Sequence, residues 1–288
     1  MAAGGAEAPA AAMRGAKGVS AVITIVVAVI TFIAGVGIGF YVLAPAPPTG
    51  PPKLVLGTNT PFPPFEYYKA NTTPPQLIGF DIELIQTLVT RIGYTYEWRD
   101  YQDFTALLAS VAANGTDIAI GAITMNGAAG ATRNQSMKFT DSYYLSNQGV
   151  LARTNDATAY CGSDAICTPQ ELDVTGRHVA VQDLTTSLYW AQDNLPNVTL
   201  GIYGSVTQVL QALSSGSADI VIIDKPAADG IAGANPTTFK VDGTIPTNEL
   251  YAFAVPKADP LRLVPRLNSA LAQTKSDGTY LALLNKYF

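Results

Sequence analysis

Charged side chains are scarce in this sequence, and the residues that build common metal sites are almost missing. Asp, Glu, Lys and Arg make up 14% of the 288 residues, with 22 acidic against 17 basic. Because there is no basic excess, nucleic acid is not expected as a partner. One histidine, His178, and two cysteines, Cys161 and Cys167, cannot supply the usual ligands of a zinc site. We therefore expect no metal and no cofactor.

The longest uncharged run lies near the N-terminus, from Val19 to Leu43. As a helix of roughly 25 residues it would be about 37 Å long, enough to cross a bilayer core of about 30 Å. The apolar part of a removable signal is shorter than this. Arg14 and Lys17 precede the run, so the positive-inside rule places residues 1–18 in the cytoplasm and the rest of the chain outside. Residues 19–43 are thus predicted to form a single transmembrane helix.

Two short segments flank this run. Lys17-Gly18-Val19-Ser20 resembles the leader of type IV pilin-like proteins, in which a peptidase cuts after the glycine and the apolar helix is kept. An uncleaved signal anchor is the alternative. Residues 44–52 are too rich in proline for a helix and predict an extended linker that holds a domain away from the membrane.

From Lys53 onward, short apolar runs alternate with amphipathic segments. The order predicts two similar β-α-β-α-β units, and therefore an α/β fold with largely parallel sheets. The predicted strands are residues 54–57, 94–98, 118–122, 178–181, 199–203 and 219–224, and the predicted helices are residues 80–92, 104–113, 186–193, 206–214 and 265–288.

Two such units predict two lobes. Lobe 1 would comprise residues 53–148 and 252–288, and lobe 2 residues 149–251, so that the chain crosses between them twice and forms a hinge. Ligands of open α/β sheets bind at the carboxyl ends of the strands. The cleft between the lobes is therefore the expected binding site.

Several motifs follow one another in this region. They are Pro61-Phe62-Pro63-Pro64-Phe65-Glu66, Gly79-Phe80-Asp81, Arg133 followed by Phe139-Thr140-Asp141-Ser142-Tyr143-Tyr144, the strand ending at Asp224, Gly278-Thr279-Tyr280 and Lys286-Tyr287-Phe288. In this order and spacing, the chain from about Lys53 to Phe288 resembles the family 3 extracellular solute-binding proteins. The resemblance implies a two-lobed, periplasmic-binding-protein type II architecture. It also implies that a polar amino acid is bound outside the cell and delivered to the permease of an ABC transporter.

The resemblance assigns ligand-binding roles to seven residues: Asn59, Phe62, Phe104, Thr124, Arg133, Thr185 and Asp224. Arg133 is expected to bind the carboxylate of the amino acid with its planar guanidinium, and Asp224 to bind the ammonium group. The alternatives are a solvated loop arginine and a turn residue before Pro226.

Weaker roles follow for the remaining five residues. Phe62 and Phe104 would cover the ligand with their rings, although either could be an ordinary core aromatic. Thr124 and Thr185 would offer hydroxyl or N–H donors to the ligand carboxylate. Asn59 stands where many relatives carry an acid that faces the ligand side chain, so its neutral amide argues against a purely cationic ligand.

The chain departs from the family pattern at two places. Residues 125–132, between Thr124 and Arg133, form a longer segment than usual and are expected to be a loop beside the ligand. Leu184 stands where relatives have glycine, and its β-carbon would hinder a strained backbone and crowd the ligand.

Cys161 and Cys167 lie in a polar loop, where a disulfide is expected outside the cell and two free thiols are the alternative. Two other functions fit the same scaffold. One is a cyclohexadienyl dehydratase-like enzyme, for which Glu66 and Asp81 are the candidate acids, although capping roles explain both residues more simply. The other is a ligand-binding sensor domain. We expect a binding protein rather than an enzyme, anchored in the cell membrane by one span.

Overall fold

The computed structural model describes residues 50–288. The predicted leader (1–18), the predicted transmembrane helix (19–43) and most of the linker lie outside the described residues. Within residues 50–288, none of the helices combines the length and the apolar character that crossing a membrane requires.

The first of two five-stranded sheets has the strand order β4-β1-β5-β12-β6. β1 runs parallel to β4 and β5, whereas β12 is antiparallel to β5 and β6. We call the part of the chain built on this sheet lobe 1. The strands of this sheet are β1 (Lys53–Thr58), β4 (Thr95–Asp100), β5 (Ile118–Ala119), β6 (Met137–Phe139) and β12 (Ala254–Pro256). A separate two-stranded hairpin consists of β2 (Tyr67–Lys69) and β3 (Gln76–Ile78). The helices of lobe 1 are α2 (Phe80–Arg91), α3 (Phe104–Ala112), α4 (Gly127–Arg133), α9 (Leu263–Ser276) and α10 (Thr279–Tyr287).

The second sheet has the order β11-β7-β10-β8-β9 and forms what we call lobe 2. β8 is parallel to β9 and β10, and β7 is antiparallel to β10 and β11. Every residue of β10 is buried, as expected for a central strand covered on both faces. The strands are β7 (Tyr144–Arg153), β8 (His178–Gln182), β9 (Thr199–Tyr203), β10 (Ile220–Asp224) and β11 (Phe239–Tyr251); the helices are α5 (Pro169–Leu172), α6 (Thr186–Asn194), α7 (Val206–Ser215) and α8 (Lys225–Ala234).

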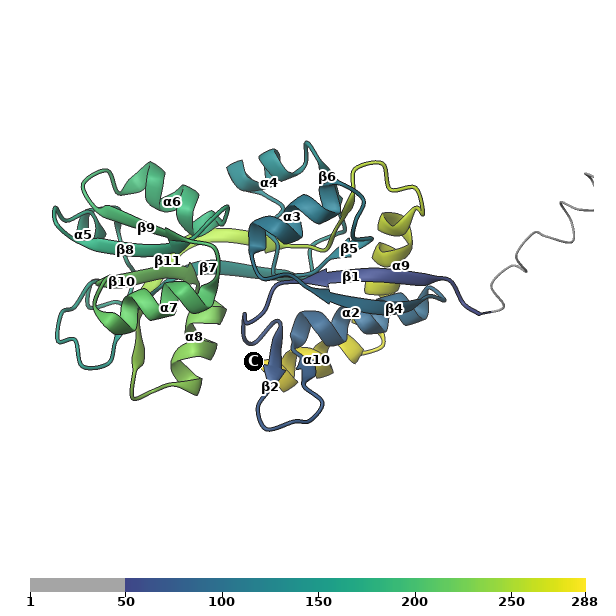
Figure 1. Cartoon of the computed structure of the whole chain (residues 1–288), viewed down its shortest axis with the longest axis horizontal. Helices are drawn as coiled ribbons and strands as arrows, with labels where there is room; N and C mark the ends of the chain where they lie inside the picture. Colours follow the sequence, from purple (N-terminus) through teal and green to yellow (C-terminus); the bar gives the residue numbers. More distant parts are fainter. Residues whose placement is uncertain (1–49) are drawn as a thin grey trace, which may run out of the picture. The chain divides into compact units, whose positions relative to one another are not determined.

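The two lobes are joined by a pair of long antiparallel strands (Figure 1). The chain enters lobe 2 through β7 and returns to lobe 1 after β11, and Tyr144 pairs with Tyr251 at the end nearest lobe 1. Because both crossings are neighbouring strands of one ladder, they make a compact hinge.

The predicted strands, and the predicted helices up to residue 214, are confirmed to within a few residues. The predicted helix 265–288 is instead two helices, α9 and α10, separated at Asp277 and Gly278. The prediction of largely parallel sheets is wrong, because each sheet has two parallel and two antiparallel pairings. The predicted strand at 118–122 is shorter, since only Ile118 and Ala119 pair in the sheet. The C-terminal helices pack on lobe 1 as expected, with Leu267 and Leu271 in the same core as Leu54 and Leu88.

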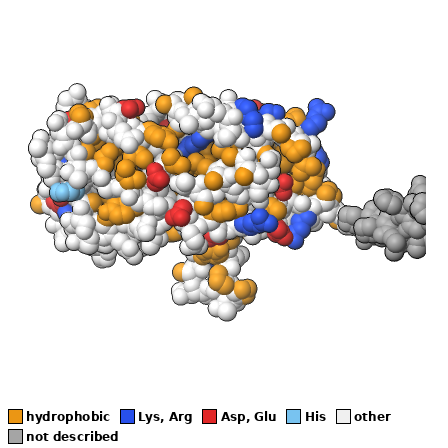
Figure 2. Space-filling model, turned by 45° about the horizontal axis from the view of Figure 1, so that its top comes forward, with side chains coloured by type: hydrophobic (Ala, Val, Ile, Leu, Met, Phe, Trp, Pro, Cys, Tyr) orange, Lys and Arg blue, Asp and Glu red, His pale blue; other side chains and the backbone are white. Residues whose placement is uncertain are grey.

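Acidic and basic side chains are intermixed on the face of the molecule shown in Figure 2, without a continuous basic area.

Candidate functional site

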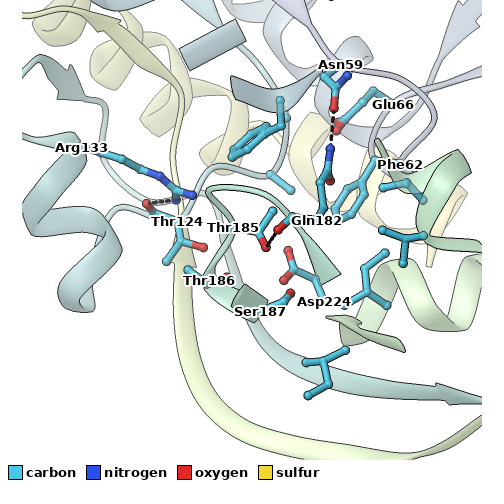
Figure 3. Close-up of a pocket in the computed structure, with 17 residues that line it drawn as sticks. Asn59, Phe62, Glu66, Thr124, Arg133, Gln182, Thr185, Thr186, Ser187 and Asp224 are labelled. Carbon is cyan, nitrogen blue, oxygen red and sulfur yellow. Dashed lines mark hydrogen bonds between the residues drawn. The ribbon is translucent and has the colours of Figure 1, made fainter. Parts of the chain in front are cut away.

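A cavity of about 40 Å³ lies between the two lobes and receives side chains from both (Figure 3). This is room for only a few water molecules, so the lobes are closed on each other. The cavity is lined by all seven residues that the sequence singled out: Asn59, Phe62, Phe104, Thr124, Arg133, Thr185 and Asp224.

Arg133 is the last residue of α4 and is buried, with 7% of its surface exposed. Its Nη1 donates to the carbonyl oxygen of Thr124 at 2.9 Å, and its Nη2 donates to that of Leu184 in lobe 2 at 3.0 Å. The guanidinium carbon lies 5.4 Å from the centre of the Phe104 ring. Burial lowers the pKa of Arg133, although nearby acids oppose this effect. The guanidinium has more N–H donors than these contacts use, so it can still bind a carboxylate.

Asp224 is the last residue of β10, and 8% of its surface is exposed. Its Oδ2 accepts a hydrogen bond from the Tyr251 hydroxyl at 2.6 Å, and its Oδ1 accepts one from the Gln148 amide. The side chain does not cap α8, so a turn role before Pro226 does not account for it. Burial raises the pKa of Asp224 to about 7, and the negative charge of Glu249 adds to the increase. A cation placed here would favour the ionised form.

Glu249 is a buried acid beside this site that the sequence analysis missed. Its Oε2 accepts hydrogen bonds from the Thr124 and Thr186 hydroxyls, both at 2.8 Å. Its Oε1 accepts hydrogen bonds from the Gln148 amide at 2.8 Å and the Thr247 hydroxyl at 2.9 Å. Glu249 therefore connects lobe 1, through Thr124, to lobe 2, through Thr186. Nothing in the sequence marks it, because a single acid in a strand is typical of a solvent-facing position.

The upper right of Figure 3 shows Asn59, Phe62 and Gln182 where the lobes meet. Asn59 donates from Nδ2 to the Tyr101 carbonyl at 2.6 Å, and its Oδ1 accepts a hydrogen bond from Gln182 Nε2 at 3.3 Å. Phe62, from lobe 1, packs against an apolar cluster of lobe 2. Gln182 was not predicted from the sequence, and its amide bridges the lobes because it also donates to the Gly204 carbonyl at 3.0 Å.

The hydroxyl of Thr185 is already engaged in local structure. It donates to the Gln182 carbonyl at 2.7 Å and accepts from the Leu188 N–H at 3.3 Å, which makes it the N-cap of α6. The N–H groups at the start of this helix are the donors that Thr185 and its neighbours can still offer to an anion.

Glu66 lines the cavity from lobe 1 with 1% of its surface exposed. It closes a turn in which the Phe62 N–H donates to the Glu66 carbonyl oxygen at 2.6 Å. The turn lies so close to α2 that a β-carbon at Gly79, whose φ is 138°, would stand 1.9 Å from the Phe65 carbonyl oxygen. Among residues 50–288, Glu66 Oε2 has no hydrogen-bond partner.

The electrostatic surroundings of Glu66 are all acidic. Burial raises the pKa of Glu66 well above its usual value, and the charges of Asp81, Asp100 and Asp224 add to the increase. Asp81, expected to cap its own helix, instead accepts hydrogen bonds from the Tyr143 hydroxyl and, at 3.0 Å, from the Ala122 N–H. Burial raises the pKa of Asp81 to about 7. Asp81 therefore does not have the capping role expected from its position in the sequence, whereas Glu66 closes the loop through its backbone carbonyl and not through its carboxylate.

The two departures from the family pattern have different outcomes. Residues 125–132 were expected to be a loop, and this prediction is wrong, because Gly127–Arg133 form α4 and end on the guanidinium of the site. Leu184 does adopt the left-handed backbone that its position was expected to require, with φ of 55°. That conformation points its carbonyl oxygen at Arg133.

The predicted disulfide between Cys161 and Cys167 is present in lobe 2. Neither cysteine lines the cavity. Within residues 50–288, no three His, Cys, Asp or Glu side chains are grouped so that they could hold a metal ion.

A sequence profile of the bacterial extracellular solute-binding proteins, family 3, matches residues 54–288. The ABC transporter arginine-binding protein 1 of Escherichia coli (strain K12) is 25% identical over 240 residues, covering 82% of this chain and 90% of that protein. A solved ancestral arginine-binding protein bound to glutamine is 27% identical, with a TM-score of 0.71 and coverage of 82% and 97%. The ancestral amino acid-binding protein AncCDT-1, a precursor of cyclohexadienyl dehydratase, is 28% identical, with a TM-score of 0.69 and coverage of 82% and 95%.

Proposed function

Because the chain belongs to family 3 of the bacterial extracellular solute-binding proteins, we propose that it binds a polar amino acid between its lobes and delivers it to an ABC transporter permease. One observation carries the proposal: Arg133 from lobe 1 and Asp224 from lobe 2 line the same small cavity. A guanidinium and a carboxylate in one desolvated space complement the two charged ends of an amino acid.

The ligand contacts follow from the chemistry of the lining. The carboxylate of the amino acid binds the free N–H groups of Arg133 and the N–H groups at the start of α6, beside Thr185 and Thr186. The ammonium group binds Asp224, whose carboxylate is held in place by Tyr251 and Gln148. Phe62 and Phe104 cover the aliphatic part of the ligand from lobe 1.

Binding requires the lobes to separate and close again. A cavity of about 40 Å³ admits only a few waters, so entry needs rotation about β7 and β11. The contacts of Arg133 with Leu184 and of Asn59 with Gln182 exist only while the lobes are together. The closed, loaded form presents both lobes to the permease as one surface.

We propose that residues 19–43 anchor the domain on the outer face of the cell membrane, with residues 1–18 inside. The domain would then remain close to its permease instead of diffusing away. Protease digestion of intact cells expressing the chain tests this arrangement, since residues 53–288 should be cleaved without lysis of the cells; a domain that is cleaved only after lysis would contradict it.

We propose a binding role without a reaction, even though AncCDT-1 is similar. Of the lining residues that could transfer a proton, Glu66 comes from lobe 1 and Asp224 from lobe 2. Asp224 has two hydrogen-bond donors that hold it as an ammonium site. An assay for release of water from cyclohexadienyl acids would contradict this proposal if turnover were seen.

Isothermal titration of the chain with each of the twenty amino acids tests the proposed function. We expect at least one polar amino acid to bind with a Kd below about 10 µM, which corresponds to roughly −7 kcal/mol. Arg133→Ala should abolish that binding while the circular dichroism spectrum is retained. If no amino acid binds at millimolar concentration, the proposed function is wrong.

A further inference from the structure

Glu249 is a buried acid of the hinge for which the proposed ligand contacts have no use. It has 5% of its surface exposed and is not among the residues that line the cavity. Its two oxygens accept hydrogen bonds from the hydroxyls of Thr124, Thr186 and Thr247 and from the amide of Gln148. Because each of these partners is a donor, the carboxylate is firmly fixed in one position.

The backbone around Glu249 is held by lobe 1, although β11 is a strand of the lobe 2 sheet. The Met125 N–H donates to the Leu250 carbonyl at 2.9 Å, and the Leu250 N–H donates to Asn126 Oδ1, also at 2.9 Å. Asn126 Nδ2 donates to the Asn248 carbonyl at 3.0 Å. Since these bonds lie on both sides of Glu249, its main chain is attached to the segment of lobe 1 that leads into α4.

A bulge separates this part of β11 from the part that belongs to lobe 2. The register between β11 and β7 shifts between Ile245 and Glu249. The Asn147 side chain closes the bulge, because its Oδ1 accepts the N–H groups of Thr247 and Asn248, both at 3.0 Å. Bulges bend a strand locally and re-aim its side chains. The bulge is therefore a point at which Glu249, together with lobe 1, can rotate against lobe 2.

The side chain of Glu249 reaches across this bend to lobe 2. Its Oε2 accepts hydrogen bonds from the hydroxyl of Thr186 and from that of Thr124 in lobe 1, both at 2.8 Å. Figure 3 shows the two threonines beside each other, below Arg133. Thr186 is the first residue of α6, where the N–H groups are the proposed partners of the ligand carboxylate together with Arg133. Glu249 thus holds the start of α6 close to Arg133.

Building on the proposed function, we propose that Glu249 is a positioning residue that fixes the N-terminus of α6 against lobe 1 in the closed form and thereby slows release of the bound amino acid. The bond between Glu249 and Thr186 crosses from one lobe to the other. It forms when the lobes close and must break before they separate. Its loss should act on dissociation, which requires opening, and much less on association, which starts from the open form.

Stopped-flow kinetics on the full chain in detergent test the proposal, and the probe is whichever of the twenty amino acids binds most tightly in calorimetry. Thr186→Val keeps the shape of the side chain and its N–H group but removes the donor to Glu249, whereas Thr186→Ser keeps a hydroxyl. Thr247→Val is the matched control, because it removes a donor to the same carboxylate at a sequence separation of 2, without a bond that crosses between the lobes.

We expect Thr186→Val to raise the dissociation rate constant roughly tenfold or more and to change the association rate constant less than about threefold. Thr186→Ser and Thr247→Val should stay within about threefold of the unchanged chain in both rate constants. An unchanged dissociation rate in Thr186→Val, or an equal increase in Thr247→Val, would overturn the inference and leave the proposed function standing.

A double-mutant cycle separates this role from a direct contact between the Thr186 hydroxyl and the amino acid. In Glu249→Ala the hydroxyl has already lost its partner, so adding Thr186→Val should change the dissociation rate less than about threefold. A full additional increase would mean that the hydroxyl binds the amino acid itself, and the positioning role would be wrong. If none of the twenty amino acids binds to the unchanged chain, the proposed function fails as well.

Discussion

At Gly230 on α8, substitution by alanine should hinder closing of the lobes without destabilising the fold. A β-carbon there would lie 2.9 Å from the Pro63 carbonyl oxygen and 3.1 Å from its carbonyl carbon, both backbone atoms of the opposite lobe. Ordinary contacts begin near 3.4 Å, so Gly230→Ala must hold the lobes apart by about half an ångström in the closed form.

The expected loss of affinity follows because the clash is present only when the lobes are closed. Overpacking destabilises the closed form by about 1–3 kcal/mol, whereas the open form, in which the two lobes are apart, is unaffected. The Kd for the amino acid should therefore rise roughly tenfold to a hundredfold. Alanine is the better helix former by about 1 kcal/mol, so the melting temperature without ligand should stay level or increase.

The same helix contains a matched control. A β-carbon added at Gly233 would have no atom within 4 Å, so Gly233→Ala gains the same helix propensity without a clash. Calorimetric Kd values and ligand-free melting curves of both variants form the test. Equal affinities for Gly230→Ala and Gly233→Ala would refute closure onto Pro63 as the origin of tight binding.

Three further predictions concern single groups. Arg133→Lys keeps the charge, but its one nitrogen carries only three donors, too few for the Thr124 and Leu184 carbonyls and both oxygens of a carboxylate. The Kd for the ligand, measured by calorimetry, should therefore rise at least tenfold, about 1.4 kcal/mol; an unchanged Kd would contradict bidentate binding. Burial raises the pKa of Asp81 from its ordinary value of 3.8 to about 7, so its contribution to stability is complete below pH 4 and is lost as the pH rises through 7. The free energy of unfolding in urea, measured between pH 4 and 8, should therefore depend less on pH in Asp81→Asn; identical slopes would argue against the raised pKa. The double variant Cys161→Ser with Cys167→Ser opens a loop with a sequence separation of 6. Its free energy of unfolding in urea should fall by about 2 kcal/mol, and the Kd for the ligand should not change; a higher Kd would mean that the loop acts on the cavity.

Much of the fold could be predicted because strands such as β1 and β10 are short, nearly continuous apolar runs. β10 is buried along its whole length and β1 over most of it, which is the pattern of central strands covered on both faces. The long hinge strands β7 and β11 carry polar residues and were not predicted. α4 was missed because Gly127 and Gly130 weaken its intrinsic helix propensity. Tertiary contacts hold this helix at both ends, since Asn126 is hydrogen-bonded to the backbone of Asn248 and Leu250, and Arg133 donates to the Leu184 carbonyl.

The site divides in the same way. Arg133 and Asp224 could be identified because they stand at fixed places in motifs that follow each other along the chain. Glu249 and Gln148 could not, because a sequence does not tell which face of a hinge strand turns inward. Glu66 was visible only as an acid in a loop, and its lack of a partner is a property of three-dimensional packing.

The split arrangement of lobe 1 has a consequence for how the polypeptide matures. Its core includes Leu267 and Leu271 from α9, and the Phe288 ring packs 5.5 Å from that of Phe65. These residues are synthesised after the whole of lobe 2, whose sheet is formed by one uninterrupted stretch. Lobe 2 can therefore fold while translation continues. The hydrophobic core of lobe 1 stays incomplete and exposed until α9 and α10 have been synthesised, and exposed hydrophobic surface of this kind is what chaperones protect.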